Sequence, residues 1–168
     1  MKQTTLIIDA DQLREIVVRL ANDVVRELTR NRKEKMVDKL EFHAALQKKL
    51  LELAPDFCCY GEKEHPIPNV QSNGRSGRID VAWWTLADRE LLTVFEIDST
   101  VRTKSLRKIL HANCPYRFWV YYGNHEIKDV IETLDTEHKI TIIDFSIAFE
   151  KRKKKLEQQE MEQLVLDI

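Results

Sequence analysis

RIDVAWWTLADRELLTVFEID, residues 78–98, is the stretch that decides the fold prediction. Its two halves, 78–85 and 91–98, are rich in β-branched and aromatic side chains, which favour strands. ADRE at 87–90 separates them and is typical of a turn, so the stretch is predicted to form a β-hairpin. Asp80 lies in the first strand, and Glu96 and Asp98 end the second.

These three carboxylates stand in otherwise apolar strands, where a buried charge is costly unless it is paired, hydrogen-bonded or bound to a cation. Glu96 and Asp98 are two residues apart, so they project from the same face of a strand. The turn is expected to bring Asp80 close to Glu96 across the hairpin. Oxygen ligands of this kind suit Mg²⁺ or Mn²⁺, which can activate a bound water against a phosphodiester.

A buried ion network explains the same acidic residues equally well. In that interpretation the carboxylates pair with arginines of the same region, namely Arg78, Arg102 and Arg107. Spacing alone does not decide between a metal site and such a network.

Two helices are predicted before the hairpin. Apolar residues at three- and four-residue steps indicate the first, which Asp9 or Asp11 would cap and the basic cluster at 30–33 would end. The second spans about 34–54, before Pro55, and its two apolar arcs predict packing on two sides. Glu41 lies at the margin of one arc and is expected to point into the fold.

The remaining pattern alternates strands and helices. A strand is expected from 57 towards 67, then a polar loop at 69–77 that contains Arg75 and suits an arm over a substrate. A helix at 103–113, a strand at 116–122, a short helix at 126–134 and a strand at 139–145 follow the hairpin, and a charged helix follows from 146. This order predicts an α/β fold, a mixed central sheet flanked by helices on both faces.

Composition bounds the kind of protein. The 168 residues suffice for one packed domain, here divided into an N-terminal helix at 1–33, a core at 34–145 and a C-terminal charged helix at 146–168. With 27 basic and 28 acidic residues the chain is unlike a strongly basic coat protein, although a local basic stripe could still bind phosphates. No apolar run approaches the roughly 20 residues that span a bilayer. Three cysteines argue against a disulfide framework, so we expect a cytoplasmic protein without membrane contact.

The residues of the hairpin resemble the PD-(D/E)XK nuclease superfamily, whose fold is called restriction-endonuclease-like. The likeness rests on GRIDV at 77–81 and VFEID at 94–98, and on the element order over about 34–145. It implies an αβββαβ core, hydrolysis of nucleic acid, with DNA favoured over RNA, and often a homodimer. It also implies that Asp80, Glu96 and Glu41 hold Mg²⁺ or Mn²⁺.

One position departs from that family's pattern. Asp98 stands where the family has a lysine, so we expect Lys104 or Lys108 of the next helix to act beside Asp80, Glu96 and Asp98 in catalysis. The substrate would be bound by basic residues around this centre, namely Arg75, Arg78, Arg102 and Lys104. The alternative hypotheses are a catalytically inactive nuclease-fold module that binds nucleic acid or a protein, and a non-nuclease domain with structural ion pairs.

Other chemically suggestive residues are interpreted as structural. His43 and His65 are expected to be structural or exposed, since His43 is two residues from Glu41 and points away from it on a helix. The tryptophans at 83, 84 and 119 lie in apolar strands and are expected in the core. KRKKK at 151–155 is followed by acidic residues and is interpreted as a charged helix face.

Overall fold

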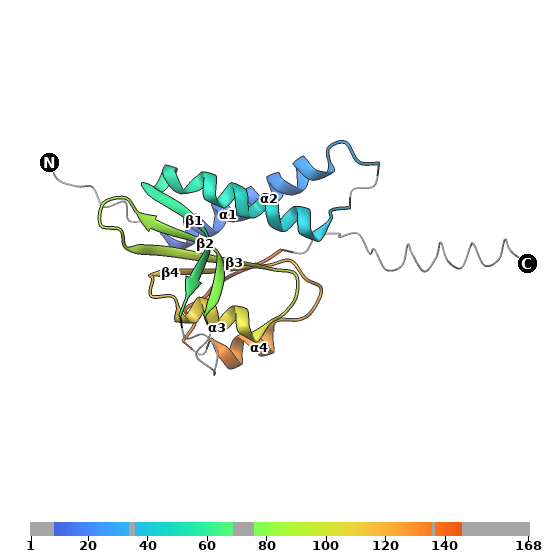
Figure 1. Cartoon of the computed structure of the whole chain (residues 1–168). Coiled ribbons are helices and arrows are strands. Elements are labelled where there is room, and N and C mark those ends of the chain that lie inside the picture. The colour runs from blue at the N-terminus through green and yellow to red at the C-terminus, as the bar shows by residue number, and fades with distance from the viewer. Residues whose placement is uncertain (1–8, 34–35, 69–75, 136, 146–168) are drawn as a thin grey trace, which may run out of the picture.

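The computed structural model describes residues 9–33, 36–68, 76–135 and 137–145 (Figure 1). Along the chain the elements are α1 (Ala10–Thr29), α2 (Lys39–Leu53), the short 3-10 helix η1 (Ala54–Phe57), β1 (Cys59–Ile67), β2 (Gly77–Thr85), β3 (Leu91–Asp98), α3 (Thr103–His111), β4 (Tyr116–Tyr121), α4 (Lys128–Leu134) and β5 (Thr141–Asp144). The predicted charged helix at 146–168 and the predicted loop with Arg75 lie outside the described residues.

In the described part of the chain the strands form a mixed five-stranded sheet in the order β1-β2-β3-β4-β5. The β1–β2 and β2–β3 pairings are antiparallel, and the β3–β4 and β4–β5 pairings are parallel. The predicted hairpin at 78–98 is thus confirmed as β2 and β3. The α/β fold with a mixed sheet between helices is also confirmed, and the order of elements from α2 to β4 is αβββαβ once the short η1 is set aside.

The helices cover both faces of this sheet (Figure 1). On one face, α1 and α2 pack on a core that includes Trp83, Phe95 and Phe118. On the other, α3 packs with Leu106 and Ile109 against alternate residues of the same strands. Because both faces are covered, the central strands are nearly continuous apolar runs, and any charged residue in them lies inside the fold.

Asp residues set where the first two helices begin. The Asp9 side chain accepts a hydrogen bond from the backbone N–H of Asp11, at 3.1 Å, and caps α1. Asp38 Oδ1 accepts from the N–H groups of Leu40, at 2.9 Å, and Glu41, at 3.1 Å. This cap explains why α2 begins five residues later than the predicted start at 34.

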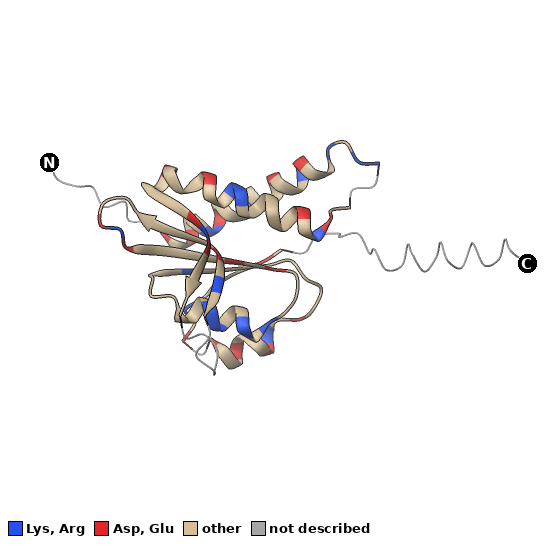
Figure 2. Ribbon diagram, in the orientation of Figure 1, with Lys and Arg blue, Asp and Glu red and all other residues tan. Residues whose placement is uncertain are grey.

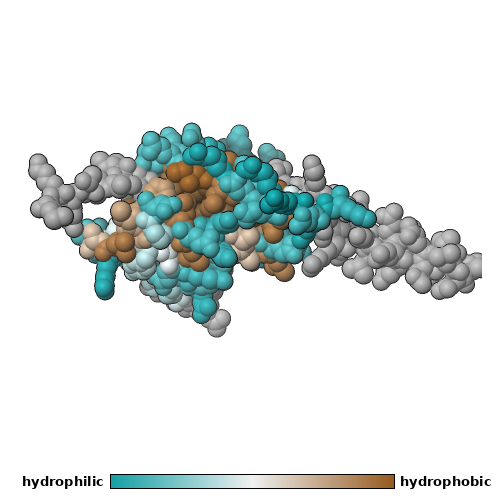
Figure 3. All heavy atoms as spheres, turned by 90° about the horizontal axis from the view of Figure 1, so that it is seen from above, coloured by the Kyte–Doolittle hydropathy of each residue, from teal (hydrophilic) through white to brown (hydrophobic). Residues whose placement is uncertain are grey.

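The side of the molecule that α1 and α2 cover combines buried apolar residues with polar ones at the surface. Leu13, Val17, Ala21 and Val24 of α1 are fully buried, and several half-buried apolar residues pack beside them. Seen from that side, an apolar area is bordered by hydrophilic residues (Figure 3). Within the described residues, each helix is too short or too polar to cross a membrane.

Candidate functional site

The sheet opens at Asp80 on both sides of β2. Pairing between β2 and β3 runs through Ala82–Val94 and Val81–Phe95, and the next opposed position would join Asp80 to Glu96. On the other side, the β1–β2 ladder continues in one register but omits the Glu64–Asp80 pair. Glu64 has a left-handed φ of 54°, which takes its backbone out of the strand conformation at that point.

Side chains take over the backbone hydrogen bonds that the ladders leave out. Asp80 Oδ2 accepts from the buried N–H of Ile97 at 2.7 Å, where a strand carbonyl would otherwise lie. The carbonyl of Asp80 accepts from Gln47 Nε2 at 2.9 Å. The opening of the sheet therefore leaves these backbone groups satisfied, as buried backbone groups require.

Glu96 lies beside this opening and pairs with Lys108. Both residues are at least nine-tenths buried, and Lys108 Nζ forms an ion pair with Glu96 Oε1. Lys108 Nζ also donates to the carbonyl oxygen of Arg78 at 2.6 Å. The other oxygen, Glu96 Oε2, is buried and has no hydrogen-bond partner among the described residues. Such an atom is costly to bury, so a ligand that reached Oε2 would gain a strong interaction.

The environment opposes the charge on Glu96. Burial and the nearby charge of Asp80 raise the pKa of Glu96 to about 8, and Lys108 offsets only part of that rise. Two carboxylates so close together cannot both ionise without cost, and a cation between them removes the cost. The electrostatics of the opening therefore favour binding of positive charge.

Asp98 is held differently. Its Oδ2 accepts from Trp119 Nε1 at 3.0 Å, and Ser105 gives it a second side-chain hydrogen bond. Burial raises the pKa of Asp98, and these two hydrogen bonds lower it. Asp98 therefore anchors the end of β3 against β4 and α3, and the lysine nearest the centre, Lys108, comes from α3.

The sequence left Lys104 and Lys108 as alternatives, and the structure separates them. Lys104 is exposed one turn before Lys108 on α3, and Arg102 is exposed with its Nε bonded to Thr100 Oγ1 at 3.0 Å. Arg78 is also exposed. Figure 2 shows basic residues along α3. Lys108 thus belongs to the buried centre, and the other basic residues form a surface beside it.

The prediction that Glu41 points into the fold is wrong. Its side chain is 48% exposed and forms an ion pair with Arg32, because the Asp38 cap places Glu41 in the first turn on the outer side of α2. Instead, α2 reaches the centre with His43 and Gln47. His43 Nε2 lies 3.6 Å from Asp80 Oδ1, and this contact raises the pKa of His43.

From the sequence, His43 is interpreted as structural or exposed, and Gln47 is not singled out. They are four residues apart, so they lie on one side of α2. Gln47 falls between Leu46 and Leu50 and is 3% exposed. An amide within an apolar helix stripe is the signal that would have found this side of the site, since a buried amide requires partners.

The carboxylate oxygens of Asp80 and Glu96 are the candidate ligands for Mg²⁺. Among the described residues, no three His, Cys, Asp or Glu side chains are grouped as metal ligands. Mg²⁺ often takes only one or two carboxylates and keeps several waters. Asp80 Oδ1 and the unpartnered Glu96 Oε2 supply two such oxygens, so the residues present fit a hydrated Mg²⁺ or Mn²⁺.

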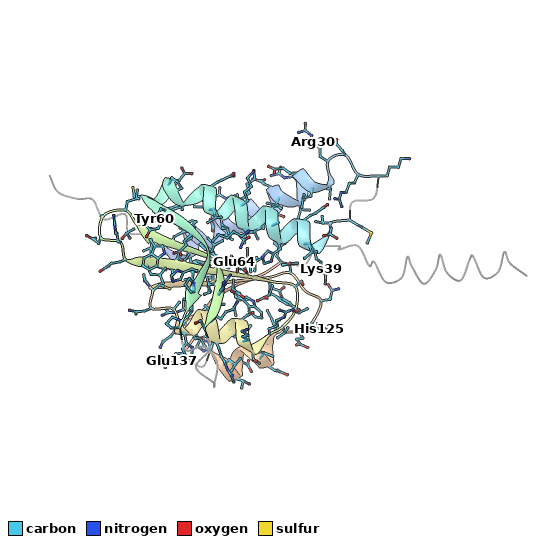
Figure 4. All side chains as sticks on the ribbon, viewed as in Figure 1. Arg30, Lys39, Tyr60, Glu64, His125 and Glu137 are labelled. Atoms are coloured by element: carbon cyan, nitrogen blue, oxygen red, sulfur yellow. The ribbon has the colours of Figure 1, made fainter. Side chains whose placement is uncertain are left out.

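The site lies at one end of the sheet. Tyr122 follows β4 and joins this end, because its N–H donates to the Asp98 carbonyl at 2.9 Å and its hydroxyl donates to the Lys39 carbonyl at 3.3 Å. In Figure 4 Lys39 and His125 mark this end, and Tyr60 lies at the other. At that far end, the chain forms an open cavity of about 660 Å³ lined by Trp84, Glu90, Leu91, Asn113, Cys114 and Pro115.

No protein-family model, curated protein or solved structure matches this chain. The resemblance to PD-(D/E)XK nucleases therefore rests on GRIDV at 77–81, VFEID at 94–98 and the order of the elements.

Proposed function

We propose that this protein is a metal-dependent nuclease that hydrolyses phosphodiester bonds, in DNA rather than RNA. The observation that carries the proposal is the opening of the sheet at Asp80 and Glu96, with Lys108 beside them. Two buried carboxylates placed together are weak evidence for a stabilising role, because the desolvation cost of buried charge can exceed the Coulombic gain from Lys108. Perturbed ionisable groups of this kind cluster at functional sites.

Each residue of the centre has a role that follows from its contacts. Asp80 Oδ1 and Glu96 Oε2 would hold Mg²⁺ or Mn²⁺, which when bound lowers the pKa of a water and neutralises charge on the phosphate. Lys108 has three N–H donors, of which two go to Glu96 Oε1 and the Arg78 carbonyl. Its third can face a phosphate oxygen or the attacking water. Asp98 positions the end of β3 and does not replace the lysine.

The substrate would lie along α3. Arg102, Lys104 and Arg107 are exposed on this helix, and Arg78 is exposed on the neighbouring strand β2. From 99 to 122 the sequence has five Lys and Arg residues and lacks Asp and Glu. Such a local basic surface supplies the phosphate attraction that the net charge of −1 does not.

The proposal includes a cytoplasmic location and a nucleic-acid partner. The three cysteines are all free, as expected in a reducing compartment. A homodimer belongs to the same proposal, because the family that the sequence resembles often cuts both strands as dimers.

Cleavage of supercoiled plasmid, single-stranded DNA and RNA with Mg²⁺, Mn²⁺ or EDTA tests the proposal. We expect metal-dependent cleavage of DNA that the conservative variant Asp80→Asn abolishes. An inactive binding module is the second candidate, favoured by the absence of lysine two residues after Glu96. Nucleic-acid binding without cleavage on any substrate, by folded protein with either metal, would establish that candidate instead.

A further inference from the structure

We propose that His43 is the positioning residue of the metal-binding carboxylate Asp80, and that α2 enters the site through this imidazole instead of through an acidic ligand. The inference rests on the proposed function, because it concerns the same centre. The role of His43 adds to the proposed function, since neither the sequence pattern nor the resemblance assigns His43 a role.

The geometry brings His43 to the open side of Asp80. Asp80 Oδ2 is fixed by the N–H of Ile97, so the carboxylate can turn only about this contact. His43 Nε2 stands 3.6 Å from the other oxygen, Oδ1, which is the one left for a metal ion. The Ile97 contact is a short hydrogen bond, and His43 stands just beyond hydrogen-bond distance on the other side of the carboxylate.

The helix that carries His43 is itself fastened to Asp80. Gln47, one turn further along α2, donates to the Asp80 carbonyl at 2.9 Å and lies 3.3 Å from Glu64 Oε1. Backbone and side chain of Asp80 are therefore both held from α2. Since Gln47 is buried and His43 is partly exposed, Gln47 fixes the position of the helix and His43 acts at the accessible side.

A carboxylate that binds metal is commonly oriented by a second hydrogen bond from outside the ligand set, and loss of that partner typically lowers metal affinity about 10–100-fold. His43 is placed for this role, because a shift of a few tenths of an ångström would bring its Nε2 from 3.6 Å into hydrogen-bond range of Asp80 Oδ1. A carboxylate oxygen can accept such a bond and bind a cation with different lone pairs. Its nitrogen facing Asp80 must carry the proton for this role, whichever form the ring takes.

Mn²⁺ binding to the intact protein, without nucleic acid, tests the assignment by calorimetry or by the electron paramagnetic resonance signal of free Mn²⁺. The variants are His43→Ala, which removes the donor, and His43→Gln, which keeps a side-chain N–H. The matched control is His65→Ala, because His65 also contacts a carboxylate, Glu62, at 2.9 Å, but on the edge strand β1.

We expect His43→Ala to weaken Mn²⁺ binding about 10–100-fold, with substantial recovery in His43→Gln and no change in His65→Ala. The Mg²⁺ concentration for half-maximal cleavage should rise in parallel, more than the maximal rate falls. A merely structural role would lower thermal stability equally in both His43 variants and leave metal affinity unchanged.

Wild-type affinity in His43→Ala would overturn the inference and leave the proposed nuclease intact. Equal loss in His43→Ala and His43→Gln would overturn it as well, because a retained donor should restore orientation. A wild-type protein that binds no Mn²⁺ would reject both the metal-dependent function and the role of His43.

Discussion

The two ends of the β2–β3 hairpin are built from the same strands but differ in strand pairing and in the side chains that they bury. At the Trp83 end, strand pairing continues past a register shift between Trp83 and Trp84 as far as Leu91. Most buried side chains there are apolar, and Trp83 Nε1 donates to the Leu50 carbonyl at 3.0 Å. At the Asp80 end, strand pairing stops, and carboxylate, amide and ammonium groups take the backbone hydrogen bonds.

The difference shows which part of the sheet serves stability alone. At the Trp83 end the buried pairs are mainly apolar, and the buried polar atom that these strands leave without a partner there among the described residues, Thr93 Oγ1, is a neutral hydroxyl. The Asp80 end instead buries charge, leaves Glu96 Oε2 unpartnered and raises a carboxyl pKa to about 8. We therefore expect substitutions at the Trp83 end to change stability, and substitutions at the Asp80 end to change chemistry as well.

The largest effect should come from Lys108→Met. Loss of the ammonium removes the only cation paired with Glu96 in the described structure, and we expect cleavage to fall about 10²–10³-fold. Lys104→Met, one turn earlier on the exposed side of the same helix, is the matched control and should lose only part of its affinity for nucleic acid. Equal losses of maximal cleavage rate in the two variants would remove Lys108 from the centre.

The next effect concerns stability against pH. Glu96 has a pKa of about 8 in the folded protein, above its ordinary 4.5. Its neutral form therefore stabilises the fold fully below pH 4.5, and this contribution is lost as pH rises through about 8. A single such group changes the free energy of unfolding by at most about 1.4 kcal/mol per pH unit.

Urea unfolding in EDTA between pH 4.5 and 9 measures this loss. Glu96→Gln should make the decline shallower, although His43 and Asp98, whose pKa values are also raised, continue to contribute. Glu52→Gln, at an exposed position of α2, should keep the wild-type slope. An unchanged slope in Glu96→Gln would show that the carboxyl is not destabilised by burial.

Gly123 and Gly61 allow the effect of an added Cβ to be compared between the Asp80 end and the Trp83 end of the hairpin. At the Asp80 end, a Cβ on Gly123 would collide with Tyr121 Oη and lie 2.5 Å from the carbonyl of Ser99, next to Asp98. At the Trp83 end, a Cβ on Gly61 would lie 2.9 Å from Leu51 Cδ2. We expect Gly123→Ala to lower the free energy of unfolding by about 1–3 kcal/mol and to reduce cleavage.

Gly61→Ala should lower stability less, because its shortest contact is with the flexible end of Leu51, and the Leu51 backbone, with Cα at 3.1 Å and O at 3.3 Å, needs to move by only a few tenths of an ångström. It should leave the cleavage rate of folded protein unchanged. Thermal unfolding and cleavage at a temperature where both variants are folded provide the two measurements. A loss of cleavage in Gly61→Ala as large as in Gly123→Ala would contradict the division between the ends.

The smallest effect belongs to the basic surface of α3. Arg102→Gln should leave stability unchanged and weaken nucleic-acid binding, with the slope of log affinity against log salt reduced by about 0.7–0.9 for one phosphate contact. Lys48→Gln, exposed on α2, is the control of equal charge change. Identical slopes for Arg102→Gln and the wild type would place the substrate elsewhere.

Much of the fold could be predicted because strand and helix periodicities differ. The hairpin follows from β-branched and aromatic residues around ADRE at 87–90, and α3 follows from its apolar face before Pro115. The start of α2 is predicted too early, at about 34, because the cap residue Asp38 sets the first residue of the helix at Lys39. The prediction that Asp80 lies close to Glu96 across the hairpin agrees with the register. That register is set by a shift between Trp83 and Trp84, because the pairing next to the turn, Trp84 with Leu91, would by itself place Asp80 opposite Phe95.

The side chains that α2 and α3 bring to the site were harder to predict than the strands. Lys104 and Lys108 are one turn apart, and the packing of α3 on β3 decides which of them meets Glu96. A lysine among Ser105, Leu106 and Ile109 lies within the buried arc, which in hindsight favours Lys108. The prediction that Glu41 points into the fold is wrong because its position at the edge of an arc leaves its direction open, and in the first turn after the Asp38 cap its side chain is 48% exposed.

The most direct test is cleavage of plasmid DNA by the wild type and by Asp80→Asn, in Mg²⁺, in Mn²⁺ and in EDTA. The opening of the sheet predicts cleavage by the wild type with either metal, none in EDTA and none by the variant at equal folded concentration. Cleavage that persists in EDTA or in Asp80→Asn, or a folded wild type that cuts no DNA with either metal, would contradict it.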